Sequence, residues 1–154
     1  MTLVHYWIRE LRITSMVDDF PTVGQVFQYH FLWKWQAKKG QHEGSKARPS
    51  CVAIIVANSE GNRVLFIAPI TSKEPIEGRE GVRVPETEAR RARLDTVMPL
   101  WVMVDELNAE ILETSFTLES REPQGAFSPA FTNAIVRGIH KSRQAGKTRL
   151  TQRK

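Results

Sequence analysis

Residues 40–71 read GQHEGSKARPSCVAIIVANSEGNRVLFIAPIT, and this stretch carries the clearest structural pattern in the chain. Two apolar runs, residues 51–57 and 64–70, are separated by a short polar segment at residues 58–62. Apolar runs of this length that are bounded by turn-forming residues are typical of buried β-strands. The stretch therefore predicts two antiparallel strands joined by a short turn.

Polar side chains stand at the outer ends of this predicted hairpin. Arg48 enters the first strand and Thr71 leaves the second, while Glu43 lies in the loop that precedes Arg48. In an antiparallel pair joined by a short turn, the start of one strand lies beside the end of the other. We therefore expect Arg48 and Thr71 side by side, with the carboxylate of Glu43 nearby.

The composition is that of a single soluble domain: 154 residues, of which 41% are hydrophobic and 25% are charged. The net charge of +5 favours an anionic partner, and RNA, DNA and an acidic protein all remain compatible with it. The lone cysteine, Cys51, cannot form a disulfide within the chain, and no zinc-binding pattern is present, so we expect a cytoplasmic protein. No apolar run approaches the roughly 20 residues that span a bilayer, so we expect no membrane partner.

The segments that flank the hairpin predict further short elements. Residues 1–22 form an N-terminal extension in which apolar residues recur at helical spacing. Residues 23–35 alternate like a β-strand with one aromatic face. Additional strands are expected at residues 82–85, 99–106 and 114–118.

A terminal helix is expected after Ser128, which is a suitable N-cap, because Pro129 then occupies the favoured first helical position. An apolar stripe follows at a spacing of about four residues, made by Phe131, Ile135 and Ile139.

The basic segment 146–154 is expected to be a disordered tail. The order of elements predicts an α+β fold, namely a small, partly open antiparallel β-barrel over residues 23–145 with a capping helix.

Four motifs in residues 23–140 resemble the PemK/MazF family of bacterial toxins. Gly24-Gln25-Val26 resembles the opening glycine-led strand of that family. Glu43 followed by Arg48-Pro49 resembles its E-x-x-x-x-R-P signature. The segment APITS at 68–72 resembles the polar end of its second strand, and WVMVDELN at 101–108 resembles a late strand seen in one branch of the family.

The resemblance implies an SH3-like barrel that forms a homodimer and is neutralised by a small cognate antitoxin. Most family members studied cut single-stranded RNA without a metal ion. The ribose 2′-hydroxyl attacks the adjacent phosphate, which leaves a 2′,3′-cyclic phosphate and a free 5′-hydroxyl. We therefore expect the toxin of a type II toxin–antitoxin system that acts as an endoribonuclease.

The chemistry of such a cleavage suits the residues at the ends of the predicted hairpin. Arg48 can hold a phosphate with its planar, permanently charged fork, and Thr71 can donate a hydrogen bond to a phosphate oxygen. In-line attack also needs a base for the 2′-proton, and Glu43 is the candidate, although a carboxylate with a pKa of about 4.3 is a weak base. We predict Arg48, Thr71 and Glu43 as catalytic residues, with no metal ion and no cofactor.

Neighbouring residues are predicted to bind the RNA strand. Ser72 adds a second hydroxyl beside Thr71, and His42 titrates in a useful range. Trp33 and Trp35 flank a lysine, which suits stacking on unpaired bases between cationic contacts. The predicted RNA-binding residues are Ser72, Lys46, His42, Lys38, Lys39 and Trp35.

Each of these interpretations has a structural alternative. Arg48 can pair with a carboxylate such as Glu106, Glu43 can be a solvated loop charge, and the two tryptophans can face a core or a dimer interface. Two other functions are open for the whole protein. One is a non-enzymatic growth inhibitor that binds a protein such as DNA gyrase, and the other is an inactive nucleic-acid-binding module.

Overall fold

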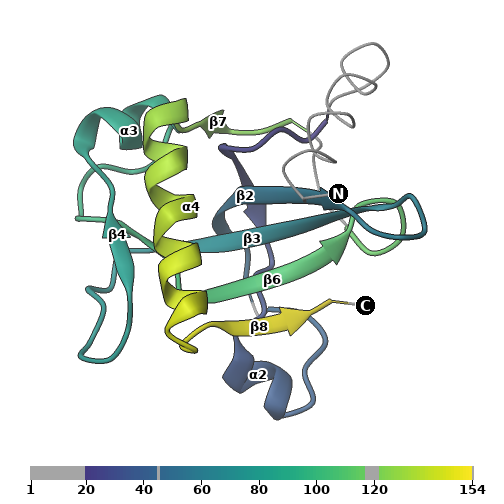
Figure 1. Ribbon diagram of the computed structural model, residues 1–154. Helices are drawn as coiled ribbons and strands as arrows, with labels where there is room; N and C mark the ends of the chain where they lie inside the picture. The colour runs from purple at the N-terminus through teal and green to yellow at the C-terminus, as the bar shows by residue number, and fades with distance from the viewer. Residues whose placement is uncertain (1–19, 45, 117–121, 154) are drawn as a thin grey trace.

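The computed structural model describes residues 20–44, 46–116 and 122–153, so the expected N-terminal helix lies outside the described residues. Within these ranges the chain alternates short strands with helices (Figure 1). The elements in chain order are β1 (Gln25–Tyr29), α2 (Lys34–Lys38), β2 (Arg48–Ala57), β3 (Arg63–Thr71), β4 (Gly81–Arg83), α3 (Glu86–Arg91), β5 (Trp101–Met103), β6 (Glu106–Ile111), β7 (Gly125–Ala126), α4 (Pro129–Gln144) and β8 (Arg149–Gln152).

The strands form one eight-stranded sheet in the order β4-β5-β3-β2-β1-β7, with β6 paired to both β3 and β8. All pairs are antiparallel except β6–β8, which is parallel. Strand β3 is central because its first half pairs with β6 and its last residues pair with β5. The mainly antiparallel sheet with its helices confirms the predicted α+β class, and the sheet is not closed within the described residues.

The predicted hairpin is confirmed as β2 and β3, whose register runs from Ser50 opposite Pro69 to Ala57 opposite Arg63. Both faces of this hairpin are covered. Cys51 belongs to a core cluster on one face, and Val52 belongs to a second cluster on the other. A strand that is buried on both faces has no polar positions to alternate with, which explains its continuous apolar run.

The predicted terminal helix is confirmed as α4, which lies across β2, β3 and β6 in Figure 1. The hydroxyl oxygen of Ser128 accepts a hydrogen bond from the backbone N–H of Phe131 at 3.2 Å and so caps the first turn. Phe131, Ile135 and Ile139 are buried in the cluster that includes Cys51. One face of the hairpin is therefore held against α4, and the other is held against the aromatic side chains of β1.

The strand expected over residues 23–35 is too long, because β1 ends at Tyr29 and α2 begins at Lys34. The side chain of Gln36 accepts a hydrogen bond from the backbone N–H of Trp33 at 3.0 Å. This local contact stabilises the first turn of α2, so the aromatic alternation is interrupted by a helix.

Two further strand predictions need correction. The segment at residues 99–106 contributes to two strands, β5 and β6, which are separated by a bend at the buried residue Asp105. The described part of residues 114–118 forms a turn, in which the backbone N–H of Ser115 donates to the carbonyl of Ile111 at 2.8 Å.

The tail expected to be disordered at residues 146–154 contains β8, which extends the sheet beside β6. The guanidinium of Arg153 lies under the end of β1, where its Nη1 donates to the hydroxyl of Tyr29 and to the carbonyl of His30, both at 2.8 Å. The prediction of disorder was wrong because it rested only on the positive charges of this segment. Arg153 is held by hydrogen bonds to Tyr29 and His30, which lie more than 120 positions earlier in the chain.

Glu110 is the acidic member of this buried network. Its carboxylate accepts hydrogen bonds from the Tyr29 hydroxyl at 2.5 Å and from the Ser115 hydroxyl at 2.8 Å. Burial raises the pKa of Glu110 above its usual value, although Tyr29, Ser115 and Arg153 counteract part of this effect.

The raised pKa of Glu110 predicts a pH-dependent effect of the Glu110→Gln substitution. Folding favours the protonated form of the Glu110 carboxyl. Protonation of Glu110 therefore adds to the free energy of unfolding below the unfolded-state pKa, and this contribution is lost as the pH rises through the folded-state pKa. The free energy of unfolding of Glu110→Gln relative to wild type should therefore increase from about pH 4 to about pH 7. Urea unfolding at both pH values checks this, with the exposed Glu60→Gln as the matched control. A difference that stays constant with pH would contradict the prediction.

Candidate functional site

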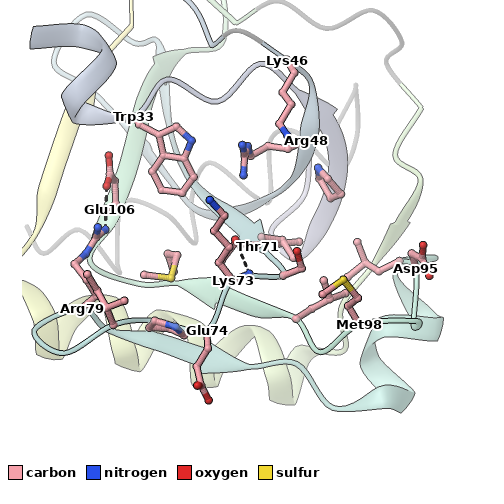
Figure 2. A pocket seen from close by; sticks show the side chains of 18 of the residues that line it. Trp33, Lys46, Arg48, Thr71, Lys73, Glu74, Arg79, Asp95, Met98 and Glu106 are labelled. Atoms are coloured by element: carbon pink, nitrogen blue, oxygen red, sulfur yellow. Dashed lines mark hydrogen bonds and ion pairs between the residues drawn. The ribbon is translucent and has the colours of Figure 1, made fainter. Parts of the chain in front are cut away.

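Arg48 begins β2 and Thr71 ends β3. The hairpin register ends with Ser50 opposite Pro69, two residues short of Arg48 and Thr71. Beyond it Arg48 pairs with Tyr29 of β1, and Thr71 pairs with Trp101 of β5. Arg48 and Thr71 both line an open groove of about 720 Å³ (Figure 2). The hairpin therefore brings the two main predicted site residues to one edge of the groove.

The groove has a cationic side and an apolar side. Lys46, Arg48 and Lys73 contribute the positive side chains near the start of β2 and the end of β3. The apolar side is formed by the segment that follows α3, with Leu94, Met98 and Leu100. A ligand that fills the groove would contact both cations and apolar surface.

Arg48 is half-buried, and its guanidinium lies over the ring of Trp33 with 5.1 Å between Cζ and the ring centroid. Among the described residues, no carboxylate forms an ion pair with Arg48. Glu106, the partner considered from the sequence, pairs with Arg79 instead. Partial burial lowers the pKa of Arg48 from its usual value, but an arginine remains protonated at neutral pH. Its N–H donors are thus available to an anion.

Thr71, Ser72 and Lys73 line the groove at the end of β3. The Thr71 hydroxyl oxygen accepts a hydrogen bond from the backbone N–H of Lys73 at 3.1 Å. This bond uses an acceptor site of the hydroxyl and leaves its own proton free to be donated. In Figure 2 the Lys73 side chain points toward Arg48 and Trp33, so two cations approach the same part of the groove.

Trp35 and Lys46, which the sequence analysis predicts to bind RNA, also line the groove. Trp35 lies in α2 and is 55% exposed, which is unusual for so large an aromatic side chain. The ammonium of Lys39 lies 5.4 Å from the centroid of the Trp35 ring, although Lys39 is outside the groove lining.

The structure does not bring Glu43, His42 or Lys38 into the groove lining. All three are exposed, and Glu43 and His42 lie in the loop between α2 and β2. The loop is fixed at Gly44, whose backbone N–H donates to the carbonyl of His30 at 3.4 Å. This contact holds the loop beside the end of β1, where Tyr29 pairs with Arg48, but the side chains of Glu43 and His42 stay outside the groove lining.

A buried ion-pair cluster in the wall of the groove, formed by Arg79, Asp105 and Glu106, was not predicted from any sequence pattern. Arg79 donates from Nε and Nη2 to the two carboxylate oxygens of Asp105 at 2.8 and 3.1 Å, and from Nη2 to Glu106 at 3.0 Å. Asp105 and Glu106 are each only 1% exposed. Asp105 and Glu106 are neighbours in the sequence, but Arg79, which pairs with both, lies 26 positions before Asp105. No local pattern therefore links the three residues. The cluster joins the loop before β4 to the start of β6.

The part of the chain that the structure describes contains neither a metal-binding cluster nor a membrane-spanning helix. No group of three or more His, Cys, Asp or Glu side chains there is arranged to hold a metal ion. None of the described helices combines the length and apolar character needed to cross a bilayer.

No protein-family model matches the chain, and neither the curated proteins nor the solved structures contain a significant match to it. The groove is the strongest indication of function in the described residues. It combines the unpaired guanidinium of Arg48 and the hydroxyl of Thr71 with two lysines and two tryptophans, namely Lys46, Lys73, Trp33 and Trp35.

Proposed function

We propose that the protein is an endoribonuclease toxin of the PemK/MazF type, which cuts single-stranded RNA without a metal ion. The observation that carries the proposal is the guanidinium of Arg48, which has no carboxylate partner among the described residues and lines the same open groove as Thr71. The guanidinium is partly exposed, so its N–H groups can reach a ligand in the groove, and a phosphate is the ligand that its planar fork fits best.

Phosphate binding is supported by the other groups around Arg48. Lys46 and Lys73 add positive charge to the same groove, and Thr71 can donate a hydrogen bond from its hydroxyl. Such contacts hold a nucleic-acid backbone regardless of its base sequence. The apolar and aromatic surface beside them, including Trp35, suits bases that are unpaired and free to stack.

In the proposed reaction the 2′-hydroxyl oxygen attacks phosphorus while its proton passes to water, and the bond to the 5′-oxygen breaks as that oxygen takes a proton from water. Arg48, Lys73 and Thr71 stabilise the additional negative charge on the phosphate oxygens in the transition state. Acidic side chains contribute less to the groove. Glu74 points away from it in Figure 2, and Glu106 is paired with Arg79. Asp95 also lines the groove, where its Oδ1 accepts a hydrogen bond from the backbone N–H of Val97 at 2.9 Å, and Glu43 lies outside the lining. We therefore assign most of the rate enhancement to charge stabilisation, and Glu43 acts as a base only when its loop moves on RNA binding.

The proposal extends to the fold and partners that the PemK/MazF resemblance implies. The open antiparallel sheet with one long covering helix is compatible with an SH3-like barrel. We propose a homodimer that acts in the cytoplasm and is held inactive by a small cognate antitoxin.

Replacing the exposed Trp35 by alanine should weaken binding to single-stranded RNA by about tenfold or more, because one base-stacking surface is lost. The melting temperature should change little, since the side chain is largely exposed. Fluorescence anisotropy with a labelled RNA strand measures the affinity, and Trp35→Phe, which keeps a ring, is the matched variant. Equal affinities for wild type and Trp35→Ala would remove Trp35 from the proposed RNA site.

Two assays on the same purified protein distinguish the proposed function from its main rival. We expect the protein to shorten a mixed-sequence single-stranded RNA in the presence of EDTA, and to leave supercoiling by DNA gyrase unaffected. A folded, antitoxin-free protein that inhibits gyrase and leaves RNA intact would overturn the ribonuclease proposal. Binding of RNA without any cleavage would instead indicate an inactive nucleic-acid-binding module.

A further inference from the structure

The guanidinium of Arg48 is oriented by an aromatic ring and not by an acid. Its Cζ lies 5.1 Å from the centroid of Trp33, within the range of a cation–π interaction. A carboxylate that orients an arginine occupies its N–H donors, whereas an aromatic face contacts the plane of the guanidinium and leaves the N–H groups at its edge. Arg48 is thus held in place with its hydrogen-bond donors still available.

Trp33 is itself held by a packed and hydrogen-bonded surrounding. Its ring contacts the buried ring of Phe31 edge to face, with 5.0 Å between the centroids and 66° between the planes. Its backbone N–H donates to the side chain of Gln36 at 3.0 Å. The next backbone N–H, from Lys34, donates to Glu106 Oε2 at 2.6 Å. The ring is therefore fixed from the core side and along the chain.

Glu106 connects this side of the groove to the opposite one. Its Oε2 binds the backbone of Lys34 beside Trp33, and its Oε1 accepts a hydrogen bond from Arg79 Nη2 at 3.0 Å. Both carboxylate oxygens are occupied, and the side chain is 1% exposed. Glu106 is therefore held away from Arg48, even though both residues line the groove.

We propose that Trp33 is a positioning residue, which presents the guanidinium of Arg48 to an RNA phosphate, and that Glu106 holds Trp33 in place from the core. This inference rests on the proposed function for its substrate. The contact between Trp33 and Arg48 can be tested without RNA.

The first test measures RNA cleavage by Trp33→Leu and Trp33→Phe. Trp33→Leu should lower kcat/KM about tenfold, since a partly desolvated cation–π contact is lost, while Trp33→Phe should stay within about threefold of wild type. In an Arg48→Lys background, Trp33→Leu should cause little further loss, because the oriented guanidinium is already absent. A purely structural role would lower activity equally in both backgrounds.

The second test reads the position of Arg48 by NMR in the absence of RNA. The Nε–H and Cδ protons of Arg48 should show an upfield ring-current shift that persists in Trp33→Phe and disappears in Trp33→Leu. Arg83, whose Cζ lies 5.2 Å from the Trp101 ring, provides the control signal, which should be the same in all variants. Arg48→Lys identifies the Arg48 signals by their loss.

The two tests separate failure of this inference from failure of the proposed function. A wild-type protein that leaves RNA intact but shows the Trp33-dependent shift would overturn the ribonuclease function and retain the contact. Full cleavage activity in a stably folded Trp33→Leu, or an Arg48 signal that does not depend on residue 33, would overturn the positioning role.

Discussion

Arg48→Ala should reduce the rate of RNA cleavage by about a thousandfold, the scale seen when a preorganised donor to a developing oxyanion is removed. Arg48 provides charge and two-pronged hydrogen bonding at the point where the predicted chemistry takes place. Alanine at this position keeps the strand but removes both contributions. Steady-state kinetics on a labelled single-stranded RNA, with the unfolding curve of each variant beside it, measures the effect.

Two matched variants define what Arg48 contributes. Arg48→Lys keeps the charge and loses the planar fork, so its activity should fall between that of wild type and that of Arg48→Ala. Arg83→Ala removes another arginine that lies over a tryptophan, outside the groove, and should cleave like wild type. An Arg48→Ala protein that folds normally and cleaves at the wild-type rate would exclude the groove as the catalytic site.

Arg79→Ala should have the largest effect on stability, lowering the free energy of unfolding by about 3–5 kcal/mol. Asp105 and Glu106 are almost fully buried next to each other, and Arg79 is the cation that pairs with both. Removal of Arg79 leaves two adjacent carboxylates in a poorly solvated place with their charge uncompensated.

Urea unfolding of Arg79→Ala beside Arg90→Ala measures this difference. Arg90 forms an exposed pair with Glu86 on α3, so its removal should cost at most about 1 kcal/mol. If Arg79→Ala does not fold, Arg79→Lys provides the measurement, since it keeps the charge and should lose only part of the stability. Similar small losses for both alanine variants would show that the buried cluster is not a major source of stability.

The elements that sequence patterns predicted well are those whose cause is local. The hairpin of β2 and β3 follows from two apolar runs and the turn between them, and α4 follows from the Ser128 cap and the stripe that contains Ile135. Arg48 and Thr71 lie at the outer ends of this hairpin, and both line the same groove, as antiparallel pairing predicts.

The elements that were missed depend on contacts between distant residues. Strand β8 exists because β6 offers it a free edge and because Arg153 finds partners at the end of β1. Helix α3 consists mostly of charged residues, and it forms because its buried Ala89 packs on the core. The charged residues of β8 and α3 suggest solvent-exposed segments when only the composition is considered. The contacts that cover these segments come from residues far away in the sequence.

The site was predicted in part for the same reason. The hairpin positions Arg48 and Thr71. Glu43 lies in the loop before Arg48, where no strand pairing fixes the path of the chain, and it stays outside the groove lining although we predicted it beside Arg48. Trp33 was noticed as an aromatic residue for stacking on bases, whereas the structure places it under the guanidinium of Arg48. Lys73 lies two positions after Thr71, a spacing that returns to the same side of an extended chain and was available in the sequence.

The proposed chemistry is tested most directly by the products formed from an RNA strand in EDTA. Two versions of one strand are compared, all-ribose and with a single 2′-deoxy nucleotide at the position that is cut. Mass spectrometry should show a 2′,3′-cyclic phosphate and a 5′-hydroxyl at the cut in the first strand, and no cleavage at the substituted position in the second. Cleavage that continues at the 2′-deoxy position would contradict attack by the 2′-hydroxyl.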